Sequence, residues 1–525
     1  MKKSIFLRVL YTFCFTALCL IDQLLGSQTG RVQFIATNLT GVVIAVIILS
    51  GYKIKNFLKP VYAIWTGLMC IFVPVVLIYG EAYPYKGKLI TALINIVLYG
   101  FIVIRVVEKQ IIDKQYSEVR WGIFTCWICM IGLMIASRYE GAWPLWFGAM
   151  FGSFYLTDYC EEQRDCIFKS VADGIILGFL IIQGLAFVFR PYDTLVRYNG
   201  LYLNANMNAL FYILSYCAFL CKWIIVKKEK KNVVLRIACL LSSGAMYGFA
   251  ILTGAKTAIL TMAIVTFAFL VCFVRLSKKK ILSFSGCVIA IGIIAFVSIP
   301  VTYMAVRYIP TVHLHPIYFE GEWSEYRIQP GESRDSEKYI TFNQLLDNNV
   351  GRILWFIDFD KESKFDKLIP CMQVYAEEVD SSTIEKNFIF TDEESAQVSP
   401  FKLRYVIHKH YYDRLNLVGH TTEDDGVAVT AEYSAPHAHN WILQMAFWFG
   451  IPVGILMIIM CVLYVAKYVG LLQTGNESYA CILGCFVTAF VVFGMFEIDW
   501  RIGQFPFTLF FLLFYLVVNK GSVKK

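Results

Sequence analysis

Long runs of apolar residues recur along almost the whole chain and are separated by mostly short polar connections. Most of these runs are long enough to cross a hydrocarbon layer of roughly 30 Å as an α-helix, and the sixth, 142–157, is short. Fourteen spans are predicted, at 5–21, 33–51, 60–79, 88–107, 121–137, 142–157, 171–189, 207–225, 234–252, 257–275, 282–305, 440–466, 478–496 and 503–519. The pattern therefore predicts an all-α polytopic membrane protein with about 12–14 transmembrane helices.

The composition supports this class. Of the 525 residues, 58% are hydrophobic and 16% are charged, whereas a soluble domain carries about 25% charged residues. A chain of this kind cannot enclose its apolar surface in one globular core. Of its 16 cysteines, all but Cys371 lie in or beside the apolar runs, where they are expected to serve as small packing residues.

The distribution of Lys and Arg orients the spans. Basic residues collect at the N-terminus, at alternate connections and in the C-terminal tail. Because cytoplasmic connections carry the excess of Lys and Arg, both chain ends are expected in the cytoplasm. Three parts follow: an N-terminal bundle of about 11 helices (1–305), a large extracytoplasmic loop (306–439) and about three C-terminal helices (440–525).

The large loop differs from the rest of the chain. Between residues 307 and 437 it has 13 Lys or Arg and 23 Asp or Glu, although the whole chain has a net charge of +8. It also holds all seven histidines: His313, His315, His408, His410, His420, His437 and His439. Two of them stand two residues apart, just before an apolar run, and this makes the end of the loop a candidate for chemistry.

The sequence at that point resembles a known signature. His439-Asn440, nine residues, Gly450 and then Gly454 is similar to the His-Asn-x9-Gly-x-x-Gly pattern of bacterial O-antigen ligases and related O-antigen and capsular polysaccharide polymerases. Here the second glycine comes one residue late, and Pro452 stands in the insertion.

Three further elements precede it in the family's order. Arg197 through Gly200 and residues 204–206 resemble an Arg-x-x-Gly…Asn-Pro-Asn element, with Ala205 in place of the proline. Residues 253–256 (Thr-Gly-Ala-Lys) resemble a Thr-Gly-Ser-Arg element, with lysine in place of the arginine. Residues 404–419 resemble the arginine-led helix that precedes the catalytic histidine. The resemblance covers about residues 190–520, and the first six spans carry no element of it.

This resemblance implies a GT-C-like glycosyltransferase architecture in the cytoplasmic (inner or plasma) membrane, with the active face extracytoplasmic. The implied reaction moves a glycan from an undecaprenyl-diphosphate carrier to an acceptor hydroxyl, on a lipid A core sugar in ligases or on another lipid-linked glycan in polymerases. A polymerase is slightly preferred, because nothing in the sequence indicates a Gram-negative envelope. The expected partners are the lipid-linked donor, the glycan or lipid-linked acceptor and the lipid bilayer, with no nucleic acid.

A lipid-diphosphate leaving group needs fixed cations at the membrane surface. Arg197, Lys256 and Arg404 are expected to supply them, because arginine offers phosphate a planar fork and lysine a point charge. The resemblance adds Asn204 and Asn206 to this substrate-binding set. Such a clamp stabilises the charge that grows as the glycosidic bond breaks, so no metal and no cofactor are expected.

The acceptor hydroxyl must also lose a proton. His439 is expected to act as the base, because an imidazole titrates near neutral pH. Asn440 is expected to orient His439 or to cap the helix that follows. His437 shares the loop but lies outside the motif position.

Other polar residues are assigned to structure or surface. His408 and Arg414 are expected to be structural or solvated. Glu497, Asp499 and Arg501 are expected to form an interfacial ion cluster, and the acid-rich stretch 320–394 to be solvated surface. An apolar stripe at helical spacing is expected to lay one segment against the membrane or the spans: Leu403, Val406, Ile407, Tyr411, Leu415 and Val418.

Two alternatives come from other classes. A transporter or flippase of lipid-linked oligosaccharide would also have many spans, but it needs polar or charged residues through the middle of the bilayer. These spans are mostly apolar, and the candidate groups are expected at one face. An envelope scaffold with a protein-binding external domain leaves the ordered motif elements unexplained.

Overall fold

The computed structural model describes residues 2–26, 31–52, 54–79, 86–109, 121–157, 159, 161–189, 197–201, 205–228, 232–275, 280–309, 400–429, 434–474, 477–497 and 504–518. Within these residues, nine helices are long and apolar enough to cross a membrane, and three shorter helices are also apolar. The chain is thus an all-α, multi-pass membrane protein, as predicted.

The N-terminal elements follow one another with short connections. They are α1 (Lys2–Ile21), the π-helical turn η1 (Asp22–Gly26), α2 (Arg31–Leu49), α3 (Ile54–Phe57), α4 (Pro60–Tyr79), α5 (Lys86–Val107), α6 (Trp121–Ala136), α7 (Trp143–Phe151), the π-helical turn η4 (Gly152–Leu156), α8 (Glu161–Phe189), α9 (Ala205–Lys228), α10 (Val233–Leu252), α11 (Lys256–Arg275) and α12 (Lys280–Tyr308). Ten of the first eleven predicted spans each coincide with one helix in this series, although α8 begins ten residues before its predicted start. The predicted span 142–157 corresponds to the short helix α7 and the turn η4.

The C-terminal elements begin with α18 (Pro400–Asp413), the 3-10 turn η10 (Thr422–Asp424), and the strands β1 (Val427–Ala428) and β2 (Ser434–Ala435). The two strands pair antiparallel, with Val427 opposite Ala435. Four helices follow: α19 (Trp441–Phe449), α20 (Ile451–Gln473), α21 (Glu477–Gly494) and α22 (Phe505–Val518).

The prediction of a single span at 440–466 is wrong, because these residues belong to two helices, α19 and α20, which meet at Gly450. Pro452 lies in the first turn of α20, and its ring excludes a continuous helix by displacing the carbonyl of Trp448 four residues earlier. The freed carbonyl accepts a hydrogen bond from the His420 backbone N–H at 3.3 Å, and the Ile451 N–H donates to the backbone carbonyl of Asn416 at 2.8 Å. The break is therefore the place where the 414–420 loop docks.

Gly450 is essential to this break. Its φ of 98° and ψ of 156° lie in a region that almost only glycine adopts. A Cβ at this position would also lie 2.2 Å from the carbonyl oxygen of Leu417. Gly419 makes the reciprocal close approach, because a Cβ there would lie 2.0 Å from the Trp448 oxygen.

Gly450→Ala is therefore expected to lower the free energy of unfolding by at least about 2 kcal/mol through backbone strain and overlap. Thermal unfolding of the purified protein in detergent measures the loss. Gly470→Ala is the matched control, because a Cβ at this position of α20 meets no atom within 4 Å. A Gly450→Ala protein as stable as the Gly470→Ala protein would contradict the docking role of Gly450.

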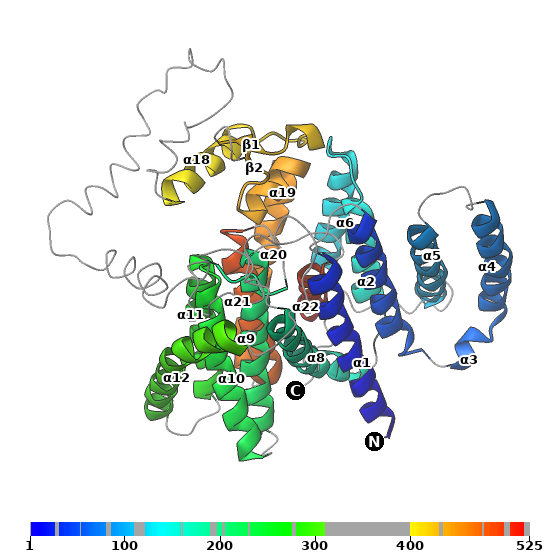
Figure 1. Cartoon of the computed structure of the whole chain (residues 1–525). Coiled ribbons are helices and arrows are strands. Elements are labelled where there is room, and N and C mark those ends of the chain that lie inside the picture. The colour runs from blue at the N-terminus through cyan, green and yellow to red at the C-terminus, as the bar shows by residue number, and fades with distance from the viewer. Residues whose placement is uncertain are drawn as a thin grey trace, which may run out of the picture.

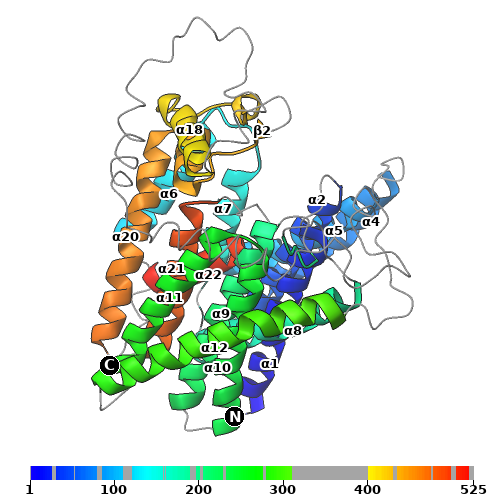
Figure 2. The ribbon, with the colours of Figure 1, turned by 60° about the vertical axis from the view of Figure 1, so that its left-hand side comes forward.

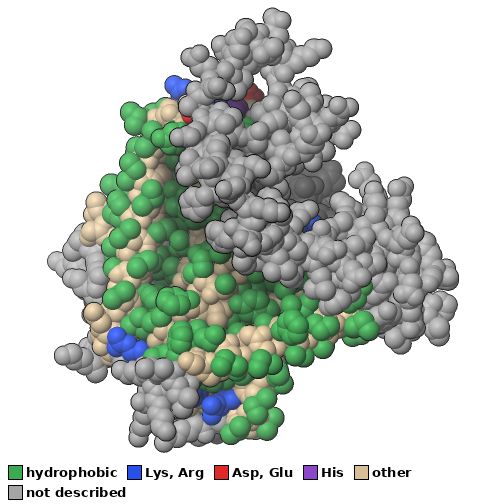
Figure 3. All heavy atoms as spheres, turned by 90° about the vertical axis from the view of Figure 1, so that its left-hand side faces the viewer, with side chains coloured by type: hydrophobic (Ala, Val, Ile, Leu, Met, Phe, Trp, Pro, Cys, Tyr) green, Lys and Arg blue, Asp and Glu red, His purple; other side chains and the backbone are tan. Residues whose placement is uncertain are grey.

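Helix α9 is the centre of the bundle. Of its apolar stretch, 94% is buried, and it packs against α8, α10, α11 and α21 (Figures 1 and 2). By contrast, only 6% of the corresponding stretch is buried in α4 and in α12. The exposed Ile, Val and Leu side chains of such helices face lipid in a membrane protein, and Figure 3 shows a face of this kind.

A cap formed by residues 400–429 and 434–450 covers one end of the bundle (Figures 1 and 2). It has its own apolar cluster, to which Ile407 and Tyr411 of α18 and Phe447 of α19 belong. The predicted stripe is thus a packing face in part: Ile407 and Tyr411 are buried and Leu415 packs beside them, but Val418 is 45% exposed. Its partners are α19 and the small sheet.

Candidate functional site

The loop before α19 places His439 at the junction between the cap and the bundle. Asn440 is the N-cap of α19, with its Oδ1 accepting from the Leu443 N–H at 3.0 Å. Its Nδ2 donates to the carbonyl of Met495 at 3.2 Å, just beyond the end of α21. Of the two roles expected for Asn440, the geometry shows the helix cap, and it also shows a tie between α19 and the end of α21.

His439 has an unusual backbone. Its φ is +49°, and it is the only non-glycine residue with positive φ among the described residues. This conformation costs on the order of 1–3 kcal/mol and persists only where the surroundings hold it. Strain of this kind is concentrated at functional sites, so the backbone conformation supports His439 as a candidate functional residue.

Glu497 joins His439 to Arg404. Its Oε2 lies 3.1 Å from His439 Nδ1, and its Oε1 accepts a hydrogen bond from Arg404 Nη2. The Glu497 side chain is 4% exposed, whereas that of Arg404 is 31% exposed. The structure thus brings together two predicted site residues, one in the loop before α19 and one on α18, through a carboxylate that follows α21.

The electrostatics of Glu497 follow from this pairing. Burial alone raises the pKa of Glu497, but the hydrogen bond from His439 and the charges of Arg404 and His439 outweigh burial and lower its pKa below the ordinary value. Because a carboxylate only accepts hydrogen bonds, the proton of the neutral His439 ring resides on Nδ1. The Nε2 atom then carries the lone pair that a general base needs.

Two further histidines surround His439. The His437 ring lies 4.4 Å from the His439 ring between centroids, and its Nδ1 accepts from the His439 backbone N–H at 3.3 Å. On α18, one turn after Arg404, burial lowers the pKa of His408, and a hydrogen bond to the His439 backbone opposes this only in part. His408 is therefore neutral at pH 7 and supports the loop, which agrees with its structural assignment.

A second polar cluster contains Arg197. Its Nε donates to the carbonyl of Thr253 at 2.8 Å, and its Nη2 donates to Asn206 Oδ1. A Cβ at Gly254, whose φ is +64°, would lie 3.4 Å from Arg197 Cγ, so the turn passes closely beside the arginine. Lys256 is exposed at the first position of α11. Two predicted elements, 197–206 and 253–256, are therefore neighbours here, whereas Asn204 lies outside the described residues.

The two clusters lie at the same end of the bundle. Cys217 Sγ donates to the carbonyl of Cys485 at 3.5 Å, and Cys221 Sγ lies 3.7 Å from Cys481 Sγ. These contacts show that α9 and α21 run antiparallel, so the start of α9 with Asn206 is level with the residues that follow α21, among them Glu497. Because α9 and α21 pack directly against each other, their axes are about 8–10 Å apart, as for other neighbouring helices.

Helix α11 leads to the same end. Cys272 Sγ lies 3.5 Å from Tyr468 Oη, and Arg275 Nη1 donates to the carbonyl of Leu472 at 3.0 Å. The helices α11 and α20 therefore run in the same direction, and their first residues, Lys256 and Ile451, both lie at the end under the cap.

Glu497 is the site residue that sequence reasoning missed. It was assigned, with Asp499 and Arg501, to an interfacial ion cluster, and the latter two lie outside the described residues. The available signal was an acid directly after a long apolar run, but charged residues are common at the borders of spans, so this signal is weak. The partners of Glu497, moreover, are 58 and 93 positions away along the chain.

Groups that could hold a metal lie elsewhere. Among the described residues, one set of three potential ligands has its atoms within 4.8 Å of one another, namely Cys221, Cys481 and Cys485. These thiols are buried between α9 and α21 within the bundle. The formal Asp-x-Asp match at residues 358–360 lies outside the described part of the chain.

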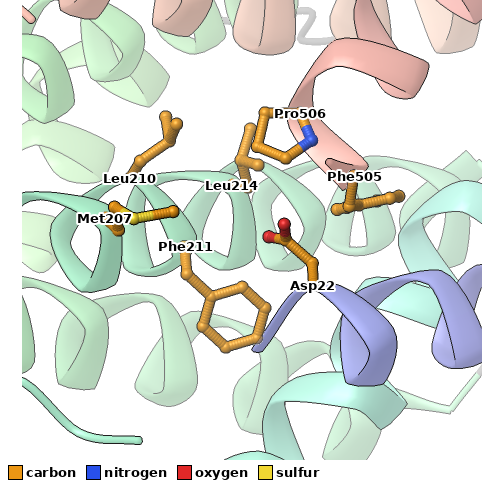
Figure 4. Close-up of a pocket in the computed structure, with 7 residues that line it drawn as sticks. All are labelled: Asp22, Met207, Leu210, Phe211, Leu214, Phe505 and Pro506. Atoms are coloured by element: carbon orange, nitrogen blue, oxygen red, sulfur yellow. The ribbon is translucent and has the colours of Figure 1, made fainter. Parts of the chain in front are cut away.

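A pocket of about 250 Å³, its mouth included, lies between η1, α9 and α22. It is lined by Asp22, Met207, Leu210, Phe211, Leu214, Phe505 and Pro506. Figure 4 shows the Asp22 carboxylate among apolar side chains. Because its lining contains an acid and no cation, this pocket does not suit a diphosphate.

Comparison with protein-family models finds none that matches this chain, and comparison with curated proteins likewise finds no match. The resemblance to O-antigen ligases and polymerases therefore stays a prediction, which rests on the four sequence elements.

Proposed function

We propose that this protein transfers a glycan from an undecaprenyl-diphosphate carrier to an acceptor hydroxyl at the outer face of the cytoplasmic membrane, in a GT-C-like architecture with a large extracytoplasmic loop. The observation that carries the proposal is the Glu497 bridge between His439 and Arg404. It combines a positioned base and a cation at the same end of the bundle as Arg197 and Lys256. A polymerase remains preferred over a lipid A core ligase.

The proposed reaction is a single displacement. His439 Nε2 takes the proton of the acceptor hydroxyl while the hydroxyl oxygen bonds to the anomeric carbon. The bond from that carbon to the diphosphate oxygen breaks, and its electron pair leaves with the diphosphate. Glu497 stabilises the imidazolium that forms. The cationic side chains of Arg404, Arg197 and Lys256 stabilise the leaving group.

One observation favours the alternative of a transporter or flippase. Asp173, within α8, accepts from Arg8 Nη2 of α1 at 2.9 Å and also pairs with Lys222 of α9. Charged residues within spans often mark a transport path. These three groups neutralise one another in part, however, and Lys222 lies on α9 near the end opposite Asn206, so they do not complete the site at His439.

The test is transfer by the purified protein in proteoliposomes, with a fluorescent undecaprenyl-diphosphate oligosaccharide as donor. We expect transfer of the glycan at the same rate with and without a metal chelator, because cationic side chains replace a metal in the proposed clamp. The length of the products separates repeated joining of units from a single transfer to an acceptor.

Two results would count against the proposal. A strict requirement for a divalent ion would remove the cationic clamp. Movement of the intact donor across the bilayer without any transfer would support the transporter instead. Loss of that movement in an Asp173→Asn variant, with Asp165→Asn as a control on the same helix, would assign it to the intramembrane acid.

A further inference from the structure

The loop residue before His439 is held by a buried side chain. Ala438, which is 0% exposed, donates its backbone N–H to Gln444 Oε1 at 2.6 Å. Gln444 lies on α19 and is itself 1% exposed. The peptide between His437 and Ala438, one residue before the left-handed His439, therefore has a fixed partner in the first turn of α19, six residues further along the chain.

Asp425 determines which end of the Gln444 amide meets Ala438. Gln444 Nε2 donates to Asp425 Oδ1 at 2.9 Å, and a carboxylate can only accept. The amide must therefore present its NH₂ group to Asp425 and its oxygen to Ala438. With the amide reversed, an N–H would face the N–H of Ala438.

Asp425 is itself held firmly. Its Oδ2 accepts from Trp448 Nε1 at 2.7 Å, and its Oδ1 accepts from the Tyr411 hydroxyl at 3.0 Å and from the Gly426 N–H at 3.1 Å. These donors come from α18, from α19 and from the turn before β1. These donors fix the orientation of the Asp425 carboxylate, and the carboxylate in turn fixes the orientation of the Gln444 side-chain amide.

We propose that Asp425 and Gln444 are positioning residues for the base of the reaction: the carboxylate orients the amide, and the amide holds the Ala438 peptide so that His439 keeps its strained backbone. Neither residue touches the substrate. This inference rests on the proposed function, in which His439 Nε2 must meet the acceptor hydroxyl. Misplacing a reacting group by about 1 Å costs on the order of 100-fold in rate.

An exchange of side chains tests the pair. In Gln444→Glu, two carboxyl groups face each other; at a pH at which both are ionised they repel, so the new carboxylate at position 444 is expected to turn away from Ala438. In Asp425→Asn, the new amide has one oxygen: if its NH₂ group faces Gln444, the Gln444 amide reverses and Ala438 loses its acceptor, whereas if its NH₂ group faces Trp448, the bond to Gln444 is kept. In the double variant, the carboxylate at position 444 accepts from both Ala438 and the NH₂ group at position 425, whose oxygen accepts from Trp448. The Tyr411 hydroxyl then loses its acceptor, so the arrangement is restored in part.

Two measurements are made on the full-length protein in detergent. In hydrogen–deuterium exchange above neutral pH, the peptide that contains the Ala438 N–H is expected to exchange at least about 10-fold faster in Gln444→Glu than in the parent, and more slowly in the double variant than in Gln444→Glu. In glycan transfer at the same pH, kcat is expected to fall about 10- to 100-fold in Gln444→Glu, with KM for the donor within about twofold, and to recover in part in the double variant. Asp424→Asn is the matched control, because this neighbouring acid pairs with Thr421 and Arg414.

Each outcome decides a different point. Exchange in Gln444→Glu as slow as in the parent, or exchange in the double variant as fast as in Gln444→Glu, would overturn the proposal. Fast exchange with an unchanged kcat would reduce the pair to a structural role. If the parent shows no transfer, the proposed function fails, and the exchange pattern still decides whether the pair holds the loop.

Discussion

Replacing His439 by Ala is expected to lower glycan transfer by about 100- to 10,000-fold, because the acceptor hydroxyl loses its base. Polymer formation in cells should stop, whereas the amount of protein and its membrane insertion should not change. The measurements are turnover with the lipid-linked donor and the surface glycan of cells that carry the variant.

His410→Ala is the matched control for this prediction. His410 lies on α18 in the same cap, but its ring nitrogen lies 3.1 Å from Arg414, the residue one turn further along, rather than beside Glu497. The control variant is expected to keep turnover within a few-fold of the parent. Normal polymer from the His439→Ala variant would defeat the assignment of the base.

Glu497→Gln is expected to lower turnover by about 100- to 1,000-fold while keeping the size of the side chain. His439 Nδ1–H and Arg404 both donate to the carboxylate. An amide offers one oxygen, so it must turn its NH₂ group toward one of them. If it faces His439, the ring changes tautomer, Nε2 carries the proton, and the base is lost.

The same substitution changes the dependence of stability on pH. Because the pKa of Glu497 is lowered in the folded protein, its ionised form stabilises the fold above the ordinary carboxyl pKa of 4.5. Breaking a buried pair costs about 3–5 kcal/mol. The parent should therefore unfold at a higher temperature than Glu497→Gln at pH 7, and the difference should shrink as the pH falls below 4.5 through the lowered pKa.

Thermal unfolding of both proteins in detergent between neutral and acid pH gives this difference. Glu423→Gln is the control, because Glu423 is exposed on the η10 turn and should leave the unfolding temperature unchanged. Equal unfolding temperatures of the parent and Glu497→Gln at pH 7 would show that the bridge contributes nothing to stability.

Apolar run length predicted the helices well and their breaks poorly. Ten of the eleven runs before residue 306 each coincide with one helix, because a long apolar run in a bilayer must satisfy its backbone polar groups internally. The run from 440 to 466 was read as one span, although it contains Gly450 and Pro452. Hydrophobicity alone does not reveal such a break, because the apolar pattern continues through it. The break is stabilised by hydrogen bonds to the 414–420 loop, which is distant along the chain.

The residues of the candidate site were likewise predicted only in part. The motif elements singled out His439, Arg404, Arg197 and Asn206 as chemically suitable residues. The residue that connects two of them, Glu497, was assigned to an ion cluster at the membrane border. Its partners stand on α18 and at the start of α19, far away in the chain, so only packing of α21 beneath the cap reveals the connection.

The sequence by itself determined that the chain is a multi-pass helical membrane protein, because apolar length and scarce charge are properties of each segment alone. It also determined which residues have suitable chemistry. Only the tertiary structure decided which of them meet: the Glu497 bridge, the left-handed backbone of His439 and the Asp425–Gln444 pair all depend on contacts between separate elements. Hydrogen bonds and ion pairs act over a few ångströms in space, and spacing along the chain does not report that distance.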